Sequence, residues 1–438
     1  MIKFWLRKFI PERIISFYHF CLAKLAALVY GYPSRRLTVV GITGTGGKSS
    51  TAYILAKILE VAGLKVGVTS TFFFKVGDWE KLNDKKMTML GRFETQRFLR
   101  RMVNAGCQVA IIETSSQGIM QHRHLDIDYD VAVLTNLYPE HLEAHGGFEN
   151  YKNAKGKLFE ILSKTKIKKF VKFPKTIIVN GDDEHAPYFL SFPAGRKIVF
   201  GLKSVSVPGA ETVVATEPSI QAVGISFKTG EATIISSLLT KFNLYNVLCA
   251  GVIAHVLGLD WQKIKNAVAV IKSVPGRFEF IENGQPFKIM IDYAFEPHAM
   301  TGLYELAKII PHGRIIHVLG SAGGGRDQAR RPILGNLAGK NADYVVITNE
   351  DPYDDDPEQI IKEVAAGARA AGKIEGQNLF LISDRRGGIQ KALSLAQPND
   401  LVLITGKGSE QAICIKNGQK ISWDDRQVVK EILSKVDF

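Results

Sequence analysis

The sequence predicts an α/β protein of two successive domains, each built on a parallel β-sheet with crossover helices. Short runs rich in Val, Ile and Leu alternate with helical stretches, which is the pattern of βαβ units. The alternation starts twice, near residues 37 and 288, and in both halves a strand runs into a Gly-rich turn. The length of 438 residues, 46% of them hydrophobic, allows two or three domains that each bury a core.

The first domain, residues 37–275, begins with a buried strand at 37–43, a Gly-rich turn and a helix from Ser49 to about Ala62. A later helix is expected at 149–162, and another around 243–257. Residues 194–236 are short alternating segments broken by Gly and Pro, which predict an antiparallel β insertion or edge. Further strands are expected at 65–69, 108–113, 130–136 and 176–180.

The second domain, residues 276–438, follows a joint at 273–277 that contains Pro275 and Gly276. Its first strand is expected at 288–293, and a helix starts near Pro297. Further strands are expected at 314–320, 344–348, 379–382 and 401–405, with helices at 357–371 and 384–396. No short-period repeat or low-complexity tract interrupts this pattern.

Residues 1–36 form a basic, apolar segment before the first strand. Seven basic residues stand against Glu12 alone in residues 1–40, and residues 14–32 are apolar except for Ser16, His19 and Lys24. The central Lys24 and the lack of a small-residue cleavage site argue against a signal peptide. Three alternatives stay open, namely a helix docked on the next domain, an interfacial amphipathic helix with basic flanks, and a membrane span.

The charge and the cysteine content limit the classes of function that are possible. The net charge of +13 is typical of nucleic-acid-binding proteins, but the chain lacks basic motifs interleaved with aromatic residues, so we expect no nucleic-acid partner. Cys21, Cys107, Cys249 and Cys414 lie far apart and form no CxxC pair, which indicates free thiols in a reducing compartment. We therefore expect a cytoplasmic protein.

The clearest local motif is the Gly-rich segment from Gly41 to Ser50, GITGTGGKSS, between a strand and a helix. Glycines let consecutive backbone N–H groups face one anion, and the helix N-terminus adds its positive pole. Lys48 can bridge terminal phosphates, and the Ser49 hydroxyl suits Mg²⁺. Gly41 lies one residue too far from Gly47 for the standard spacing, so this is a variant loop. It predicts binding of a nucleoside triphosphate, against the alternative of a Gly-rich turn with an incidental lysine.

The loop TGTGGKSS at 43–50 resembles the TGTNGKTT loop of the Mur ligases and their folylpolyglutamate synthetase relatives. The resemblance continues collinearly to the C-terminus, and the 113–123 block is similar to that of the branch that makes UDP-MurNAc-tripeptide. The matching blocks after the loop are ETSS (113–116) and QHR (121–123), which make up the 113–123 block, followed by NL (136–137), EHL (140–142), HG (145–146), YKNAK (151–155), NGDDE (180–184), GRFE (276–279), DYA (292–294), RD (326–327), RP (331–332) and GKGSE (406–410). Each block is weak alone, but their shared order makes them specific together.

The resemblance implies a P-loop ATPase domain followed by a smaller Rossmann-like C-terminal domain. It also implies an ATP-dependent ligase of peptidoglycan synthesis, which joins an amino acid to a carboxylate through an acyl phosphate. The implied ATP-binding residues are Gly44, Thr45, Gly46, Gly47, Lys48, Ser49, Ser50, Asn246 and Arg277. The implied residues for the acceptor substrate are Thr88, Ser115, Gln121 and Arg123.

The implied catalytic residues are Lys48, Glu113, His141 and Lys155. Ser49, Glu113 and His141 would hold Mg²⁺. Lys155 would react with CO₂ to form a carbamate, an anionic oxygen ligand for a second Mg²⁺. Without the resemblance, a lone Glu or His in a loop is usually structural, and Lys155, between Lys152 and Lys157, is typical of a solvated charge.

The implied binding residues for the incoming amino acid are Arg326, Glu350, Asp351, Tyr353, Gly406 and Glu410. Here the chain departs from the family's D-N-P-R loop, because Tyr353 stands where diaminopimelate-specific enzymes have Arg. Asp354, Asp355 and Asp356 follow. This acidic loop either attracts a side-chain amine, which suits lysine at least as well as diaminopimelate, or is a solvated turn with helix-capping acids. Phe295 and Ser409 replace two family histidines.

The family also carries an N-terminal domain of about a hundred residues that binds the UDP end of the precursor, whereas 36 residues precede the first strand here. We expect a monomer that acts on UDP-MurNAc-L-Ala-D-Glu or a related, even lipid-linked, precursor, with peripheral membrane contact through residues 1–36. Two alternatives are a folylpolyglutamate synthetase-like ligase and a non-catalytic, nucleotide-binding Mur-like protein.

Overall fold

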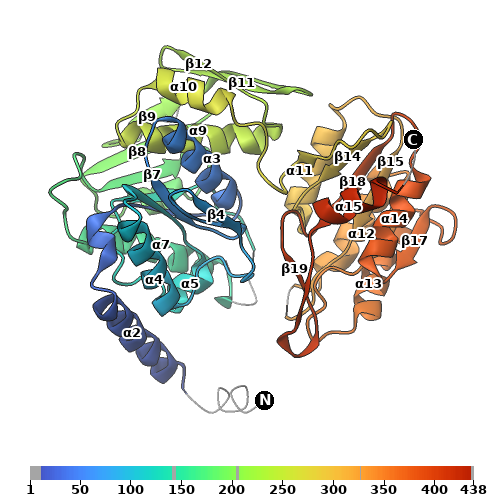
Figure 1. The fold of residues 1–438 in the computed structure, drawn as a ribbon, viewed down its shortest axis with the longest axis horizontal. Helices are drawn as coiled ribbons and strands as arrows, with labels where there is room; N and C mark the ends of the chain where they lie inside the picture. Colours follow the sequence, from blue (N-terminus) through green and yellow to red (C-terminus); the bar gives the residue numbers. More distant parts are fainter. Residues whose placement is uncertain (1–10, 141–144, 204–206, 326, 436–438) are drawn as a thin grey trace. The chain divides into compact units, whose positions relative to one another are not determined.

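The computed structural model describes residues 11–140, 145–203, 207–325 and 327–435. The chain forms two compact units (Figure 1). Unit 1 consists of Met1–Ser219, Ser226–Ser236 and Asn243–Ile271, and unit 2 of Ile220–Ile225, Ser237–Phe242 and Lys272–Phe438. His141 and Arg326, two of the predicted site residues, lie outside the described residues.

Unit 1 is built on a nine-stranded sheet of order β4-β3-β2-β5-β1-β6-β7-β8-β9. Its strands are β1 (Thr38–Thr43), β2 (Val66–Thr69), β3 (Phe73–Val76), β4 (Trp79–Leu82), β5 (Val109–Glu113), β6 (Val131–Leu134), β7 (Thr176–Asn180), β8 (Arg196–Gly201) and β9 (Glu211–Val214). The strands from β2 to β9 in this order pair in parallel. The central strands are buried on both faces, which explains their unbroken runs of Val and Ile.

The prediction of an antiparallel insertion at 194–236 is wrong for its first part. β8 and β9 pair in parallel with the main sheet, and the last four residues of β8 are buried like those of a central strand. The remaining strands, β10 (Thr216–Gln221), β11 (Gly224–Thr229) and β12 (Ala232–Ser236), form a separate sheet of three. The antiparallel hairpin of β3 and β4, closed by a left-handed Gly77, was not predicted.

Three helices cover one face of the unit 1 sheet. Met102 of α4 (Arg92–Asn104), Ile119 of α5 (Ser116–Met120) and Leu158 of α7 (Phe148–Lys164) share a core cluster with strand residues. The other helical elements among the described residues of this unit are α2 (Glu12–Val29), η1 (Pro33–Arg36), α3 (Lys48–Val61), α8 (Ala186–Leu190), α9 (Thr240–Val256, which starts in unit 2) and α10 (Trp261–Ala269). Thus α3 begins directly after the Gly-rich turn that follows β1.

Unit 2 contains a six-stranded sheet of order β13-β14-β18-β15-β16-β17. Its strands are β13 (Glu279–Phe280), β14 (Lys288–Ile291), β15 (Ile315–Leu319), β16 (Tyr344–Thr348), β17 (Leu379–Ile382) and β18 (Leu401–Ile404). All pairs are parallel except that of β13 with β14. β19 (Ala412–Cys414) and β20 (Lys420–Ser422) form a small antiparallel pair, and η2 (Lys416–Gly418) lies between them.

The unit 2 sheet has a hydrophobic core on each face. One core includes side chains of α11 (Pro297–Ala307), α12 (Arg330–Asn341) and α13 (Pro357–Ala370). The other includes side chains of α14 (Arg385–Leu395) and α15 (Asp425–Leu433). The predicted α/β class, with a parallel sheet in each half, is confirmed.

Two expectations concern the chain as a whole. The four cysteines are free thiols, of which Cys21 is exposed and the others are buried. Over the described parts of the chain, no helix has both the length and the apolar character that crossing a bilayer requires.

Candidate active site

The phosphate-binding loop links β1 to α3 in a conformation that requires glycine. Gly44 and Gly47 have φ of 149° and 77°. A Cβ atom on Gly44 would lie 2.0 Å from Thr135 Oγ1, and one on Gly47 would lie 2.4 Å from Asn246 Oδ1. No side chain of the described residues caps α3, so its first N–H groups remain available to an anion.

The end of β6 holds this loop in place. The Thr45 N–H donates to the Asn136 carbonyl at 2.9 Å, and the Gly46 N–H donates to Asn136 Oδ1 at 2.8 Å. Thr135 Oγ1 donates to the Gly46 carbonyl at 2.6 Å. These hydrogen bonds fix the loop backbone, which lowers the entropic cost of binding a phosphate.

Lys48 folds back over the loop that precedes it. Its Nζ atom donates to the carbonyl oxygens of Gly44 at 3.1 Å and Thr45 at 2.9 Å. These bonds keep the ammonium group beside the loop glycines, where the sequence predicts a phosphate.

Glu113 is the last residue of β5. At the carboxyl end of this strand it belongs to a hydrogen-bond network with three hydroxyl-bearing residues. Its Oε2 accepts hydrogen bonds from Ser49 Oγ at 2.8 Å and the Thr71 N–H at 2.7 Å, and its Oε1 accepts one from Thr71 Oγ1 at 2.7 Å. The Thr71 and Thr88 hydroxyl oxygens are 3.0 Å apart. Ser49, Glu113 and Thr88 were predicted from the sequence, but Thr71 was missed. Its only signal is its position just after the end of β2.

Lys155 is buried against the phosphate-binding loop. Its side chain is 2% exposed, and Nζ donates to the Gly44 carbonyl at 2.7 Å. The same atom lies 4.4 Å from the ring centroid of Tyr151. Burial, followed by the nearby Lys48 ammonium, holds the pKa of Lys155 well below its usual range, although Glu113 and Glu140 oppose this. The alternative of a solvated surface charge is therefore wrong.

The predicted acceptor residues lie around α5 and the turn after it. Ser115 Oγ caps α5 by accepting from the Gly118 N–H at 3.1 Å. Arg123 donates to Gln121 Oε1 at 2.6 Å and to the Met89 carbonyl, and its buried Nε has no partner among the described residues. Burial lowers the pKa of the Arg123 guanidinium.

Two side chains near the loop have structural contacts. Asn246 accepts a hydrogen bond from Thr51 Oγ1 at 3.3 Å and donates to Asn243 Oδ1 at 3.1 Å, which supports the first turns of α3. His145 Nε2 lies 3.0 Å from Ser116 Oγ, and burial and the Lys155 charge lower its pKa. His145 follows the segment that contains His141.

The main feature of unit 2 is Lys407, which was not among the predicted site residues. Its fully buried Nζ donates to both carboxylate oxygens of Asp351, at 2.9 and 3.0 Å. It also donates to Glu410 Oε2 at 2.8 Å and the Ala412 carbonyl at 2.6 Å. The Cys414 N–H donates to Asp351 Oδ1 at 2.7 Å. Asp351 and Glu410, both predicted to bind the incoming amino acid, are thus ion-paired with a lysine of the chain.

The three aspartates that follow Tyr353 also have partners in the fold. Asp354 accepts from the Asn417 N–H at 2.8 Å, and Asp355 from the Gly324 N–H at 3.1 Å. Asp356 caps α13 by accepting from the Glu358 N–H at 3.1 Å. Helix capping, one of the two alternatives for this acidic loop, is therefore correct for Asp356.

Glu350 differs from its acidic neighbours. It is buried, and its Oε2 atom has no hydrogen-bond partner among the described residues. Gly406 has φ of 101°, and a Cβ atom there would lie 2.4 Å from Glu350 Oε2. Burial, with the adjacent Asp351 charge, raises the pKa of Glu350. Its Oε2 atom is therefore an acceptor that no described residue uses.

Tyr293 contacts both Arg277 and Glu410. The Arg277 guanidinium stacks 4.1 Å from the ring centroid of Tyr293, and Nη1 donates to the Gly276 carbonyl at 3.0 Å. The Tyr293 hydroxyl donates to Glu410 Oε1 at 3.3 Å. The rigid ring stack positions the guanidinium of Arg277, the predicted nucleotide contact in this unit.

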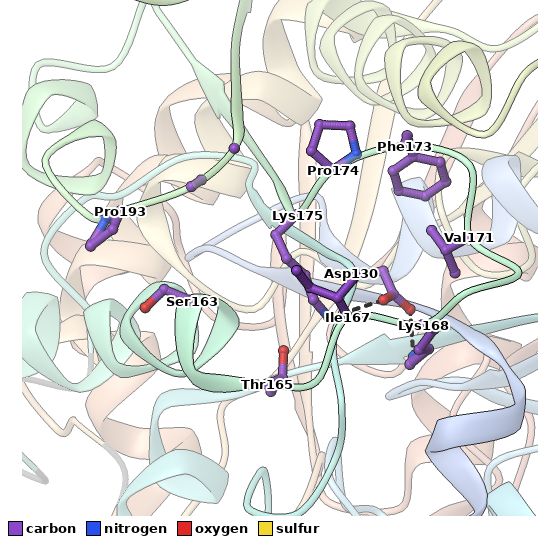
Figure 2. A pocket seen from close by; sticks show the side chains of 12 residues that line it. Asp130, Ser163, Thr165, Ile167, Lys168, Val171, Phe173, Pro174, Lys175 and Pro193 are labelled. Carbon is purple, nitrogen blue, oxygen red and sulfur yellow. Dashed lines mark hydrogen bonds and ion pairs between the residues drawn. The ribbon is translucent and has the colours of Figure 1, made fainter.

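A cavity of about 400 Å³ lies at the opposite edge of the unit 1 sheet, where β6 and β7 begin (Figure 2). Figure 2 shows Lys168 and Lys175 both directed at Asp130. Their Nζ atoms lie 2.5 and 3.0 Å from its carboxylate oxygens, and the Val39 N–H donates to it at 2.8 Å. Both lysines of this cavity are paired with the Asp130 carboxylate, and the phosphate-binding loop remains the candidate site.

Fold and site together define a P-loop protein with a second α/β unit that carries its own buried polar cluster. Residues 42–254 match the family model of the Mur ligase middle domain, and residues 276–408 match that of the Mur ligase glutamate ligase domain. The chain belongs to the Mur ligase family. It is therefore an ATP-dependent ligase that forms carbon–nitrogen bonds. The resemblance found in the sequence is confirmed.

The relatives include tripeptide-forming enzymes. The chain is 36% identical to the UDP-N-acetylmuramyl-tripeptide synthetase of Roseiflexus sp. (strain RS-1), over 95% of this chain and 82% of the relative. It is 34% identical to the UDP-N-acetylmuramoyl-L-alanyl-D-glutamate--2,6-diaminopimelate ligase of Geobacillus kaustophilus (strain HTA426), over 96% of this chain and 84% of the relative. A solved structure of such a diaminopimelate ligase superposes with a TM-score of 0.59 at 27% identity, covering 91% of this chain and 78% of that one.

The folylpolyglutamate synthetase alternative is more distant. The Mycobacterium tuberculosis folylpolyglutamate synthase, solved with ADP and AMPPCP, superposes with a TM-score of 0.68. The superposition covers 88% of this chain and 92% of the synthase chain, at 17% sequence identity. At this identity the likeness shows a shared fold alone.

Proposed function

We propose that this chain adds a diamino acid, L-lysine or meso-diaminopimelate, to the D-Glu carboxylate of UDP-MurNAc-L-Ala-D-Glu or a related precursor. The convergence of Ser49, Glu113 and Lys155 on the phosphate-binding loop carries the proposal, because the reaction needs a metal and a phosphate site beside one another. The names of the relatives support this acceptor and a diamino acid as the incoming substrate.

The first half of the reaction transfers the γ-phosphoryl group of ATP to the acceptor carboxylate. In this proposal the N–H groups at the start of α3 and Lys48 bind the phosphates. The protein forms no covalent bond to the phosphoryl group and acts by positioning the acceptor carboxylate. Ser49 and Glu113 offer the hydroxyl and carboxylate oxygens that Mg²⁺ prefers, with His141 as a further ligand. When bound, Mg²⁺ neutralises charge on the phosphoryl oxygens.

A metal site of this kind needs few protein ligands. The described residues contain no group of three His, Cys, Asp or Glu side chains placed to hold a metal ion. Mg²⁺ commonly keeps several waters and binds through one or two carboxylates together with substrate phosphates. Glu113 with Ser49 fits that mode of binding.

Lys155 is proposed to carry a carbamate. Its depressed pKa favours the neutral amine, whose lone pair forms a bond to the carbon of CO₂ while one N–H proton is released to solvent. The neutral side chain thereby becomes an anion beside the Gly44 carbonyl and close to Lys48. Attraction to the Lys48 ammonium and to a bound divalent ion would retain the modification.

The acceptor is proposed to bind where Thr88, Ser115, Gln121 and Arg123 lie. The Arg123 guanidinium has a buried Nε with no partner in the described part of the chain, and its positive charge complements that of a peptide carboxylate. Thr88 is 3.0 Å from Thr71, whose backbone and hydroxyl both contact Glu113, so the metal ligand and the acceptor side share one hydrogen-bond network.

The incoming amino acid is proposed to bind in unit 2 with an amine on Glu350, beside Gly406 and Tyr353. Asp351 and Glu410 are both ion-paired with Lys407, and the aspartates from 354 to 356 bond to backbone groups. Glu350 therefore remains as the buried acceptor for an ammonium group. Arg326 is expected to bind the carboxylate end.

The test measures phosphate release with ATP, UDP-MurNAc-L-Ala-D-Glu and a panel of diamino acids. We expect release that requires both the acceptor and one diamino acid, and none with dihydropteroate plus glutamate. Release without any acceptor would contradict the ligase function. Activity with the pteroate pair alone would support the folylpolyglutamate alternative, and a protein that binds ATP without turnover would support the non-catalytic one.

A further inference from the structure

Helix α2 docks on unit 1 through its small residues. Ala23 is 2% exposed, and Ala26 and Ala27 are fully buried. Figure 1 shows α2, in dark blue, beside α4. Docking by alanines lets the two helix backbones approach closely and leaves the larger side chains of α2 on the other side.

The outward side of α2 is apolar. Phe17 and Leu28 are 67% and 64% exposed. Apart from Phe20, the exposed apolar residues are related by steps of three, four or seven positions, which places them on one helical face. The exposed apolar residues are Ile14, Phe17, Tyr18, Phe20, Leu25, Leu28 and Val29. Folded soluble proteins rarely leave so continuous an apolar face uncovered unless it binds a partner.

Specific polar contacts hold this face outward. Lys24 Nζ lies 2.8 Å from Asp126 Oδ1, and Ser16 Oγ lies 2.7 Å from His122 Nε2. At the end of the helix, Arg100 Nε donates to the Tyr30 carbonyl at 2.9 Å. Rotation of α2 to bury Phe17 or Leu28 would break these contacts, so exposure of the apolar face belongs to the folded state.

The positive charge of α2 and of the sequence before it favours binding to an anionic surface. Residues 13–30 contain no acidic residue, and the exposed side carries Arg13 and the partly exposed Lys24, which is paired with Asp126. The sequence before α2 adds Lys3, Arg7 and Lys8. We propose that α2 lies in the interface of an anionic lipid bilayer, with its aromatic and aliphatic face inserted and its basic residues at the headgroups.

A second copy of the chain is the competing occupant, and charge disfavours it. A symmetric pairing of two α2 helices would bring two sets of basic residues together, with Glu12 as the one acidic residue of each helix. An anionic membrane instead attracts each nearby Lys or Arg, and the apolar side chains add burial. The proposal is independent of the ligase chemistry, because none of the α2 residues belongs to the proposed active site.

The test is co-sedimentation of the full chain with vesicles of phosphatidylcholine alone or mixed with phosphatidylglycerol, at low and high salt. We expect the protein to pellet with the anionic vesicles at low salt and much less with the neutral ones or at high salt. Phe17→Ser combined with Leu28→Ser should weaken binding about tenfold or more. Ile167→Ser is the matched control, because Ile167 is 87% exposed on another surface of unit 1.

Three further measurements keep the result interpretable. The circular dichroism spectrum and the phosphate-release rate with a soluble acceptor should be the same in the double variant and the wild type, which shows that the fold is intact. Arg13→Gln should weaken binding and reduce its salt dependence. The proposal is overturned if the wild type stays soluble with anionic vesicles, or if the double variant pellets like the wild type. It is also overturned if sedimentation velocity shows a dimer that only the double variant loses.

Discussion

The Nζ atom of Lys155 lies 2.7 Å from the carbonyl oxygen of Gly44, so a buried lysine of α7 contacts the loop in which the sequence predicts the ATP phosphates. A cation at this position is costly, because burial and the nearby Lys48 both disfavour the protonated form and lower the pKa of Lys155. The protein tolerates the cost at a position where a neutral amine has a chemical use. The first two predictions follow from this contact.

Replacement of Lys155 should separate its charge from its size. We expect Lys155→Ala to lower the phosphate-release rate at least about a hundredfold, because the anion that a carbamate supplies is lost. Lys155→Glu should retain part of the rate, since its carboxylate lies near the position of the carbamate oxygens. A carbon-13 NMR signal of a lysine carbamate should appear in the wild type under labelled CO₂ and be missing in both variants. Full activity in the Ala variant would remove the carbamate from the proposal.

The same burial should make Lys155 a cost to stability. The folded-state pKa is depressed, so between that pKa and the usual 10.5 the unfolded chain binds a proton that the folded chain does not. Stability therefore rises with pH over this window, and the cost is largest at low pH. In CO₂-free buffer, in which Lys155 carries no carbamate, we expect Lys155→Met to raise the melting temperature by a few degrees at neutral pH, with a gain that shrinks as the pH approaches 10.5. Lys152→Met, on the same helix and with an ion pair to Glu149, is the control and should show no such gain.

Lys407 should be among the most important residues for the stability of unit 2. Lys407→Met leaves Asp351 buried without its cation, and loss of one partner of a buried ion pair costs about 3–5 kcal/mol. We expect a corresponding fall in the free energy of unfolding of unit 2, measured by urea denaturation. Adding Asp351→Asn should recover much of the loss, because the amide oxygen can still accept from the Cys414 N–H. Equal stability of the single and double variants would mean that the pair is not the cause.

Much of the fold could be predicted from the sequence, because buried parallel strands have a strong hydrophobic signal. The expected strands at 344–348 and 379–382 coincide with β16 and β17, and the helix expected at 357–371 ends one residue beyond α13. The wrong prediction for the strand at 211–214 has a physical cause. Glu211–Val214 is half exposed at the sheet edge, so its pattern does not distinguish a parallel edge strand from an antiparallel insertion.

The candidate site could be predicted only in part, because its residues are brought together by tertiary contacts. The phosphate-binding loop is continuous in the sequence and has a recognisable spacing. Thr71 and Lys407 have no such signal, since the first contacts Glu113 across the sheet edge and the second contacts Asp351 from a different strand end. The charge pattern of residues 350–356 likewise does not reveal which carboxylates the fold already pairs.

The last prediction concerns Glu350, whose Oε2 atom has no partner among the described residues, and compares it with Asp354 of the same loop. Glu350→Gln keeps the size of the side chain but removes the charge that an incoming ammonium group would meet. A hydrogen bond to a charged group contributes about 1.5–3 kcal/mol, so we expect the KM for the diamino acid to rise about 10- to 100-fold while the KM for ATP stays constant. Asp354→Asn is the matched control, because that carboxylate bonds to the Asn417 N–H and lies on the surface. If both variants raised the KM equally, general attraction by the acidic loop would explain the effect, and Glu350 would have no specific role in binding the amine.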